Sequence, residues 1–283
     1  MGQLASRMGS FTTVRRDSPL SDDLIHSVAP SIFAGAAHHT RSERYAYIPT
    51  IDVLNGLRKE GFQPFSVSQS RTRLADRREH TRHLIRLRHV GDIAQHDSLL
   101  RTGEAAHEIV LLNSHDGTSS YQMLSGMFRF VCANGMVCGD IENDIRIRHK
   151  GNSAMADVIE GAYKVLNHQT IVADTVEHFR TIQLGTAEQA IFADEAIGLR
   201  FDGDKAPITS EQALQAHRFE DRDNSLWSVL NRTQENLIRG GMEGRSTTGK
   251  IRRVRAVTGM DQDTKLNRAL WSLAQRMAEL KAA

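Results

Sequence analysis

The chain has 283 residues, of which 40% are hydrophobic and 25% are charged, so it can bury a sizeable core and is not disordered over most of its length. No stretch approaches the roughly 18 apolar residues of a membrane span, and residues 1–16 lack the apolar segment of a secretory signal. Two cysteines, Cys132 and Cys138, cannot form a disulfide framework and are expected to be buried as small hydrophobic residues. We therefore expect a soluble cytoplasmic protein.

The first half of the chain alternates helix and strand signals. Residues 1–20 are polar and predict a flexible arm, and Ser21 followed by two aspartates predicts a short helix that ends before Pro30. Thr50 is expected to cap the next helix, and Gly61 to end it. Strands are predicted at 62–67, 83–90 and 108–113, with residues 70–80 as a polar hairpin tip or loop.

The segment 119–133 has apolar residues at helical spacing and predicts a helix. Asn134-Gly135 fits either a two-residue hairpin turn or the left-handed cap of that helix, and the preceding period favours the cap. A pair of strands is predicted at 136–141 and 145–149, with Arg146 and Arg148 on one face of the second strand.

From Ser153 onward the pattern is helical. Helices are predicted at 153–183, 186–199, 224–239 and 263–280, with a short one from Ser210. Strands followed by helices indicate an α+β fold, with a basic antiparallel sheet or hairpin in the strand-rich half and a helical C-terminal half. The predicted organisation is an arm at 1–20, an α+β core domain at 21–201 and a helical region with a basic glycine-rich loop at 202–283.

Basic residues gather in two places, although the net charge is only +2. Between 71 and 89 the chain carries Arg71, Arg73, Arg77, Arg78, Arg82, Arg86 and Arg88 with three histidines. Arg86 and Arg88 alternate with apolar residues, so they share one face of a strand, as do Arg146 and Arg148. If the two strands share a sheet face, their like charges repel unless they hold an anion. A surface that tracks a phosphate backbone and a solvated polar face with local ion pairs therefore remain the two interpretations.

The second basic segment spans 239–255 and contains Gly244-Arg-Ser-Thr-Thr-Gly-Lys250-Ile251. This run nearly matches the phosphate loop of nucleotide triphosphatases, but Ile251 replaces the magnesium-binding hydroxyl and the run follows a predicted helix. A basic loop that contacts nucleic acid and a solvated loop remain the two interpretations.

No motif of a conventional enzyme is present, and we expect no cofactor and no metal site. The chain lacks a G-x-S-x-G elbow and an H-E-x-x-H motif. Asp140, Glu142 and Asp144 alternate in sequence and could bind a divalent cation, although acids in a solvated turn explain them as well.

Seven phrases spread along nearly the whole chain resemble one family. They are RYAYIPT at 44–50, GFQP at 61–64, HLIRLR at 83–88, FRFVCANG at 128–135, RHKG at 148–151, LWSVLNRTQEN at 226–236 and LNRALW at 266–271. This set resembles a plasmid- and prophage-encoded family known only as a domain of unknown function, which implies a mobile-element setting in bacterial cytoplasm. The order of elements is also similar to that of phage single-strand annealing proteins, which form rings or filaments that hold one strand in a basic groove. That similarity lies at the level of the fold and assigns no residue a role.

The hypothesis is an ATP-independent protein that binds and anneals single-stranded DNA in plasmid or phage recombination, assembled as a homo-oligomeric ring or filament and not attached to a membrane. The groove would be lined by Arg71, Arg73, Arg86, Arg88, Arg146, Arg148 and Lys150, with Lys250, Arg252 and Arg253 securing the strand or a neighbouring subunit. Two alternatives stay open: a mobile-element protein that blocks host defence or restriction by binding protein, and a metal-dependent nuclease that uses Asp140, Glu142 and Asp144.

Overall fold

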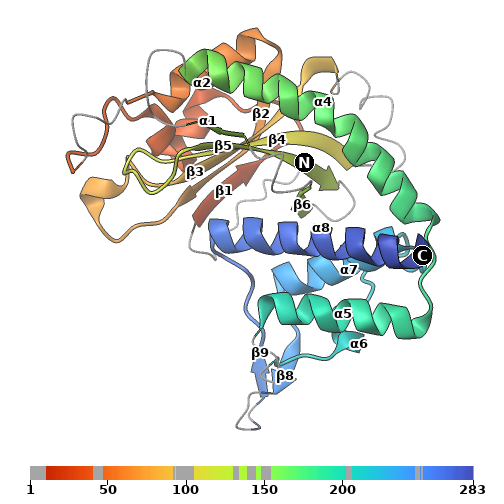
Figure 1. Ribbon diagram of the computed structural model, residues 1–283. Coiled ribbons are helices and arrows are strands. Elements are labelled where there is room, and N and C mark those ends of the chain that lie inside the picture. The colour runs from red at the N-terminus through yellow and green to blue at the C-terminus, as the bar shows by residue number, and fades with distance from the viewer. Residues whose placement is uncertain are drawn as a thin grey trace. The chain divides into compact units, whose positions relative to one another are not determined.

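The protein folds into two compact units. The computed structural model describes residues 11–40, 47–91, 93, 105–129, 134–138, 145–147, 154–201, 206–245, 249 and 251–282. The first unit comprises the described residues within Met1–Val137 and Ile141–Gln169, and the second those within Cys138–Asp140 and Thr170–Ala283. The first holds a sheet and the second holds mainly helices, so the α+β fold is confirmed (Figure 1). The boundary that the sequence suggests, after residue 201, falls inside the second unit.

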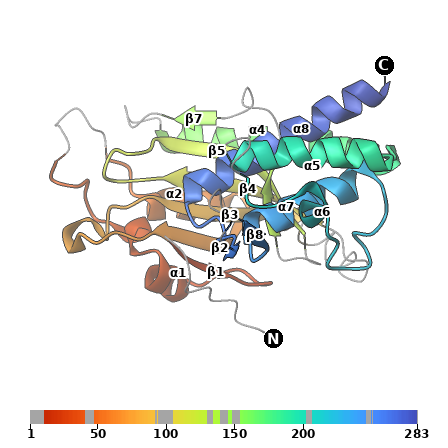
Figure 2. The same cartoon turned by 90° about the horizontal axis from the view of Figure 1, so that it is seen from below.

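An antiparallel sheet forms the first unit, and its strand order follows the chain. The strands of the continuous path are β1 (Phe11–Arg15), β2 (Phe62–Ser70), β3 (His83–His89), β4 (Ala105–Asn113), β5 (Tyr121–Arg129) and β6 (Asn134–Val137). A further strand, β7 (Ile145–Ile147), pairs with β5 at its other end, and Figure 2 shows it beyond β5. The strands predicted near 62, 83 and 108 are confirmed. The predicted pairing of the 136 and 145 strands is wrong, because both pair with β5 instead.

Part of the predicted arm is a strand. Phe11–Arg15 forms β1 along β2, with Val14 opposite Val67. Val14 is buried, and the Thr12 hydroxyl donates a hydrogen bond to the Val28 carbonyl (3.0 Å). Five residues with a single apolar side chain facing inward give too weak an alternation to be recognised in the sequence. Residues 1–10 lie outside the described part of the chain.

The predicted helix at 119–133 is wrong, because the described part of this segment forms β5. Both faces of β5 are covered: Tyr121 and Met123 are buried on one face and Leu124 and Phe128 on the other. A strand buried on both faces reads as a continuous apolar run, which can match helical spacing by chance. Asn134-Gly135 is neither a helix cap nor a turn, since both residues lie within β6.

Helices cover one face of the sheet and complete its hydrophobic core. They are α1 (Asp22–Val28), the 3-10 turn η1 (Pro30–Phe33), α2 (Thr50–Lys59) and the first part of α4 (Ala154–Thr181). The Ser21 hydroxyl caps α1 as predicted, accepting from the Leu24 amide at 3.4 Å. Thr50 is the first residue of α2 and not its cap, while Gly61 follows the helix with φ +89° as expected.

The core beneath these helices takes alternate residues of the strands. Its members from the sheet include Val67, Ile85, Leu87, Ile109 and Leu111, packed against α1, α2 and α4. Because strand side chains alternate, the residues between them project from the opposite face of the sheet. Arg86 and Arg88 therefore belong to that opposite face.

The second unit is built around α7 (Leu226–Arg239), of which residues 226–237 are all buried. Its other elements are the rest of α4, α5 (Thr186–Arg200), α6 (Ser210–Ala213), the hairpin of β8 (Glu243–Arg245) and β9 (Ile251–Arg253), and α8 (Met260–Ala282). The predicted helices are confirmed. The N-cap of α5 is Gly185, whose amide donates to the Glu188 carboxylate at 2.7 Å. Gly240 ends α7 with φ +62°, where a Cβ would lie 2.7 Å from the Arg255 carbonyl carbon.

Candidate nucleic-acid interface

The loop between β2 and β3, residues 71–80, is held by hydrogen bonds to its backbone; we call it the basic loop. At its ends the Ser70 amide donates to Arg82 O (2.8 Å) and the Thr81 hydroxyl donates to Ser70 O (3.1 Å). Within it, the short 3-10 turn η2 (Ala75–Arg77) is followed by a bond from the Gln69 side-chain amide to Arg78 O (2.6 Å). The loop therefore has a defined backbone on which its side chains are displayed.

The arginine and carboxylate side chains of the basic loop are exposed to solvent. Arg71, Arg73, Arg77 and Arg78 are all exposed, and so are Asp76 and Glu79. Asp76 lies 3.6 Å from Nε2 of the buried His38. Among the described residues, no carboxylate forms an ion pair with Arg73, Arg77 or Arg78. Exposed guanidinium groups on a loop with a defined backbone can bind phosphate oxygens with paired N–H donors.

Arg86 and Arg88 have the opposite surroundings. Together with Arg15 they surround Glu108, and we call these four residues the arginine cluster. The Glu108 carboxylate accepts from Arg15 Nη1 at 2.8 Å, from Arg86 Nη1 at 3.2 Å and from Arg88 Nη2 at 2.9 Å. Arg86 and Arg88 are 6% and 5% exposed and Glu108 is fully buried. The cluster is therefore an internal ion network that joins β1, β3 and β4.

Aromatic rings complete the surroundings of the arginine cluster. The Arg15 guanidinium lies 3.8 Å from the ring centre of Phe128, and that of Arg88 lies 4.3 Å from the ring centre of Phe65. Contacts of this kind stabilise a desolvated cation through the ring quadrupole. Arg15 is on β1 and Phe128 is on β5, so the sheet curls enough to bring side chains of these two strands together.

Burial and the three surrounding guanidinium groups act in opposite directions on the pKa of the Glu108 carboxyl group. Burial by itself raises the pKa of Glu108, but the three guanidinium groups outweigh it and lower that pKa to about 2. Burial lowers the pKa of Arg15, against the attraction of Glu108. The network contains three cations and one anion. Without the Glu108 carboxylate, the buried guanidinium groups of Arg86 and Arg88 and the largely buried one of Arg15 would face one another without a counter-charge.

The second basic segment forms a hairpin, β8–β9, which we call the basic ribbon. Arg253 is exposed and its Nε donates to Gly241 O at 2.9 Å. Residue 250 and the side chain of Arg252 lie outside the described part of the chain. The run 244–251 links two strands, whereas a phosphate loop links a strand to a helix, so the geometry of a nucleotide triphosphatase is absent here.

The chain matches one protein family over most of its length. The family described as Domain of unknown function (DUF932) matches residues 37–271. The chain belongs to this family. Two relatives from Escherichia coli (strain K12), UPF0380 protein YfjQ and UPF0380 protein YafZ, are each 47% identical to it over 277 residues, which cover 98% of this chain and 98% of each relative. No solved structure matches the chain significantly.

The structure brings together only some of the basic residues that the sequence singled out. In this family member Arg71 and Arg73 lie on the exposed loop, Arg86 and Arg88 lie in the interior, and Arg146 is exposed on β7. Arg148 and Lys150 lie outside the described residues, as do Asp140, Glu142 and Asp144. Sequence reasoning missed Arg15 and Glu108. Glu108 carried a signal, since it interrupts an apolar strand on the same face as Arg86, whereas Arg15 carried none.

A buried polar network lies on the helix-covered side of the sheet. The Thr50 hydroxyl oxygen is 3.0 Å from Nε2 of His83, 3.0 Å from Nε2 of His115 and 3.1 Å from the Tyr121 hydroxyl, and it accepts from the Asn113 amide at 3.0 Å. All five residues are fully buried. Without access for a substrate, we interpret this network as structural: it fastens the start of α2 to β3, β4 and β5 and to the loop after β4.

The described residues contain no group of three His, Cys, Asp or Glu side chains arranged to hold a metal ion. Cys138 is buried, as expected, and Cys132 lies outside the described part. In the same part of the chain no helix is long and apolar enough to cross a membrane.

Proposed function

We propose that the protein binds single-stranded nucleic acid, and that the basic loop makes the first contact with the strand. The observation that carries this proposal is the exposure of Arg73, Arg77 and Arg78 on a loop whose backbone is fixed at both ends. A loop that is ordered before binding loses little conformational entropy on binding. Exposed Arg146 and Arg253 are further phosphate ligands on other elements.

Phosphate contacts would dominate this binding. Three of the loop's guanidinium groups have no ion pair within the described residues, whereas large exposed aromatic side chains are rare there. Binding through phosphates is insensitive to base sequence and weakens steeply with salt. We therefore expect a strand-binding protein without sequence specificity.

The finer function that we propose is annealing of complementary strands without ATP, in recombination of plasmid or phage DNA in the bacterial cytoplasm. Annealing requires only that phosphates be neutralised while bases stay accessible, and arginines that bind the backbone satisfy both conditions. Support comes from the exposed arginines of the basic loop.

The test is fluorescence anisotropy of a labelled single strand and of the matching duplex over a salt series. The wild-type protein should favour the single strand and lose affinity steeply with salt. Replacing Arg73, Arg77 and Arg78 together by Gln should lower the magnitude of the log–log salt slope by about 2, since each phosphate contact on a single strand contributes about 0.7. Thermal unfolding should change little, because the three side chains are exposed.

A control variant with the same change in charge is Arg180→Gln, Arg222→Gln and Arg276→Gln, three exposed arginines of the second unit. It should keep the wild-type slope. Equal losses in both variants would show that net charge, and not the loop, drives binding. No binding of any strand at low salt by well-folded protein would refute the proposal and point to a protein partner, as in the blocking of host defence.

A further inference from the structure

Three histidine rings lie in contact at one end of the basic loop, and we call His38, His39 and His80 the histidine stack. The ring centres of His38 and His39 are 4.1 Å apart with an angle of 35° between the ring planes. Those of His38 and His80 are 5.2 Å apart, with an angle of 77°. His80 is the last residue of the basic loop, whereas His38 and His39 follow η1, so the stack joins two segments that are distant in sequence.

The middle ring of the histidine stack is held from several sides. His38 is 3% exposed, its amide donates to the His115 carbonyl at 3.1 Å, and the His115 amide donates to the His80 carbonyl at 3.0 Å. The Nδ1 atom of His38 lies 2.8 Å from the Thr40 hydroxyl oxygen, and its Nε2 lies 3.6 Å from the Asp76 carboxylate of the basic loop. His38 is therefore a fixed support for the ring that packs on it.

His39 is the exposed member of the histidine stack. One face of its ring lies against His38, and because the residue is exposed, the outer face of the ring is turned to solvent. An aromatic ring that is supported on one face and open on the other is a surface on which nucleobases stack. Since His38 supports the ring before a ligand arrives, little side-chain freedom is lost on stacking.

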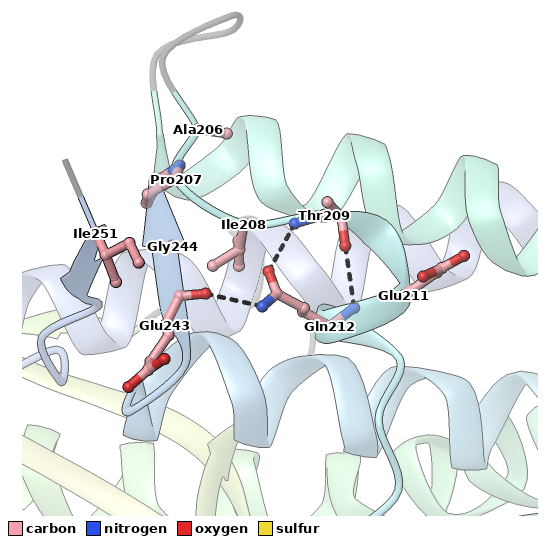
Figure 3. Close-up of a pocket in the computed structure, with 9 residues that line it drawn as sticks. All are labelled: Ala206, Pro207, Ile208, Thr209, Glu211, Gln212, Glu243, Gly244 and Ile251. Carbon is pink, nitrogen blue, oxygen red and sulfur yellow. Dashed lines mark hydrogen bonds between the residues drawn. The ribbon is translucent and has the colours of Figure 1, made fainter. Parts of the chain in front are cut away.

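The second unit contains a groove that offers no ring to a base. Figure 3 shows this groove of ≈ 660 Å³, which lies between the segment that begins at Ala206 and the basic ribbon. None of its nine described lining residues is aromatic or a histidine, and its apolar surface comes mainly from Pro207, Ile208 and Ile251. Of these two places, the histidine stack is the one where a base can stack.

We propose that His39 is a base-stacking residue, and that one nucleobase of the strand whose phosphates bind the basic loop packs on the outer face of its ring. The inference rests on the proposed binding of single strands and adds to it the place of a base. Because the stack contacts the loop through His80 and Asp76, the two contacts with the strand lie on one continuous surface.

Stacking at His39 is compatible with annealing and with the absence of sequence specificity. Every base has a π face, so a stacking contact tolerates any base. The contact uses the face of the base and leaves its pairing edge accessible to a complementary strand.

The test is fluorescence anisotropy of a labelled single strand with two variants of the full chain. His39→Ala should weaken binding about fivefold or more, the lower end of what one stacked base contributes. Its log–log salt slope should equal that of the wild type, because stacking releases no counterions. His39→Phe should keep the affinity, since it keeps a ring. A strand of the same length made of abasic sites should bind His39→Ala and the wild type equally.

The matched control is His178→Ala, which removes an exposed histidine from α4 in the second unit and should bind as the wild type does. A direct readout comes from His39→Trp, because the two tryptophans of the chain, Trp227 and Trp271, are both buried. The fluorescence of the new, exposed tryptophan should be quenched by a strand with bases and not by the abasic strand.

Two results would overturn the proposal while leaving strand binding intact. Wild-type affinity in His39→Ala would show that the ring does not contact the strand. A smaller salt slope in that variant, with weaker binding of the abasic strand, would make His39 a phosphate ligand instead. Failure of the proposed function is separable, since it would appear as a wild-type protein that binds no strand at low salt, and that result would refute both.

Discussion

The basic loop and the arginine cluster are neighbours in sequence, but their arginines have opposite surroundings. Arg73, Arg77 and Arg78 are exposed, whereas Arg86 and Arg88 are buried against Glu108. The difference arises from partners that are distant in the sequence: Glu108 is on β4 and Arg15 on β1. A run of arginines thus contains two populations, one that holds the sheet together and one that is available to a ligand.

Glu108→Gln should cause the largest loss of stability, because it acts on the arginines that hold the sheet together and not on the exposed ones. This change leaves the guanidinium groups of Arg15, Arg86 and Arg88 without their shared carboxylate, and we expect a loss of roughly 3–5 kcal/mol in the free energy of unfolding. Urea unfolding followed by circular dichroism measures it. Glu79→Gln, on the exposed loop, should change stability by less than about 0.5 kcal/mol. Equal losses of unfolding free energy in the two variants would contradict the distinction between the exposed loop and the arginine cluster.

Lowering the pH should remove the stability that Glu108 provides. The pKa of Glu108 is lowered to about 2 from an ordinary value of 4.5, so the unfolded chain takes up the proton first as the pH falls. The stability that Glu108 provides is complete above pH 4.5 and is lost between there and pH 2. The difference in unfolding free energy between the wild type and Glu108→Gln should therefore shrink over this window. A difference that stays constant down to pH 2 would show that Glu108 is not the group that titrates.

A smaller effect is expected at Gly126, which lies on β5 beside the arginine cluster. A Cβ there would lie 2.7 Å from Val110 Cγ2 and 3.3 Å from Arg86 Nη1, so Gly126→Ala should displace both and cost about 1–3 kcal/mol. The comparison is Gly198→Ala in α5, where a Cβ meets nothing within 4 Å and a gain of about 0.5–1 kcal/mol is expected. Thermal unfolding of both variants tests the prediction, and a loss at Gly198 as large as at Gly126 would contradict it.

The sequence predicts the fold better than it predicts the site. The Ser21 cap of α1, Gly61 after α2 and the alternation in β3 all depend on neighbouring residues, so the sequence predicts them correctly. The strand β5 was misread because burial on both faces removes the alternation that marks a strand.

The site depends on pairing between distant strands, which no local pattern contains. Alternation placed Arg86 and Arg88 on one face correctly, but it could not tell whether that face is open to solvent or closed. Glu108 could have been suspected from its position in an apolar strand. Arg15 could not, since a five-residue strand at the start of a polar segment has no recognisable pattern.

The order of strands in the sheet has a consequence for how the chain folds during synthesis. Each of the strands β2 to β5 pairs with the strand that precedes it in the chain. Pairing between consecutive strands dominates the sheet, and contacts between segments close in sequence form quickly. The sheet can grow strand by strand as the ribosome releases it. The arginine cluster behaves differently, because Arg15 and Glu108 are separated by 93 residues. Closing that contact requires β4 to be in place, so the arginine cluster cannot form until the chain has been made at least as far as Glu108.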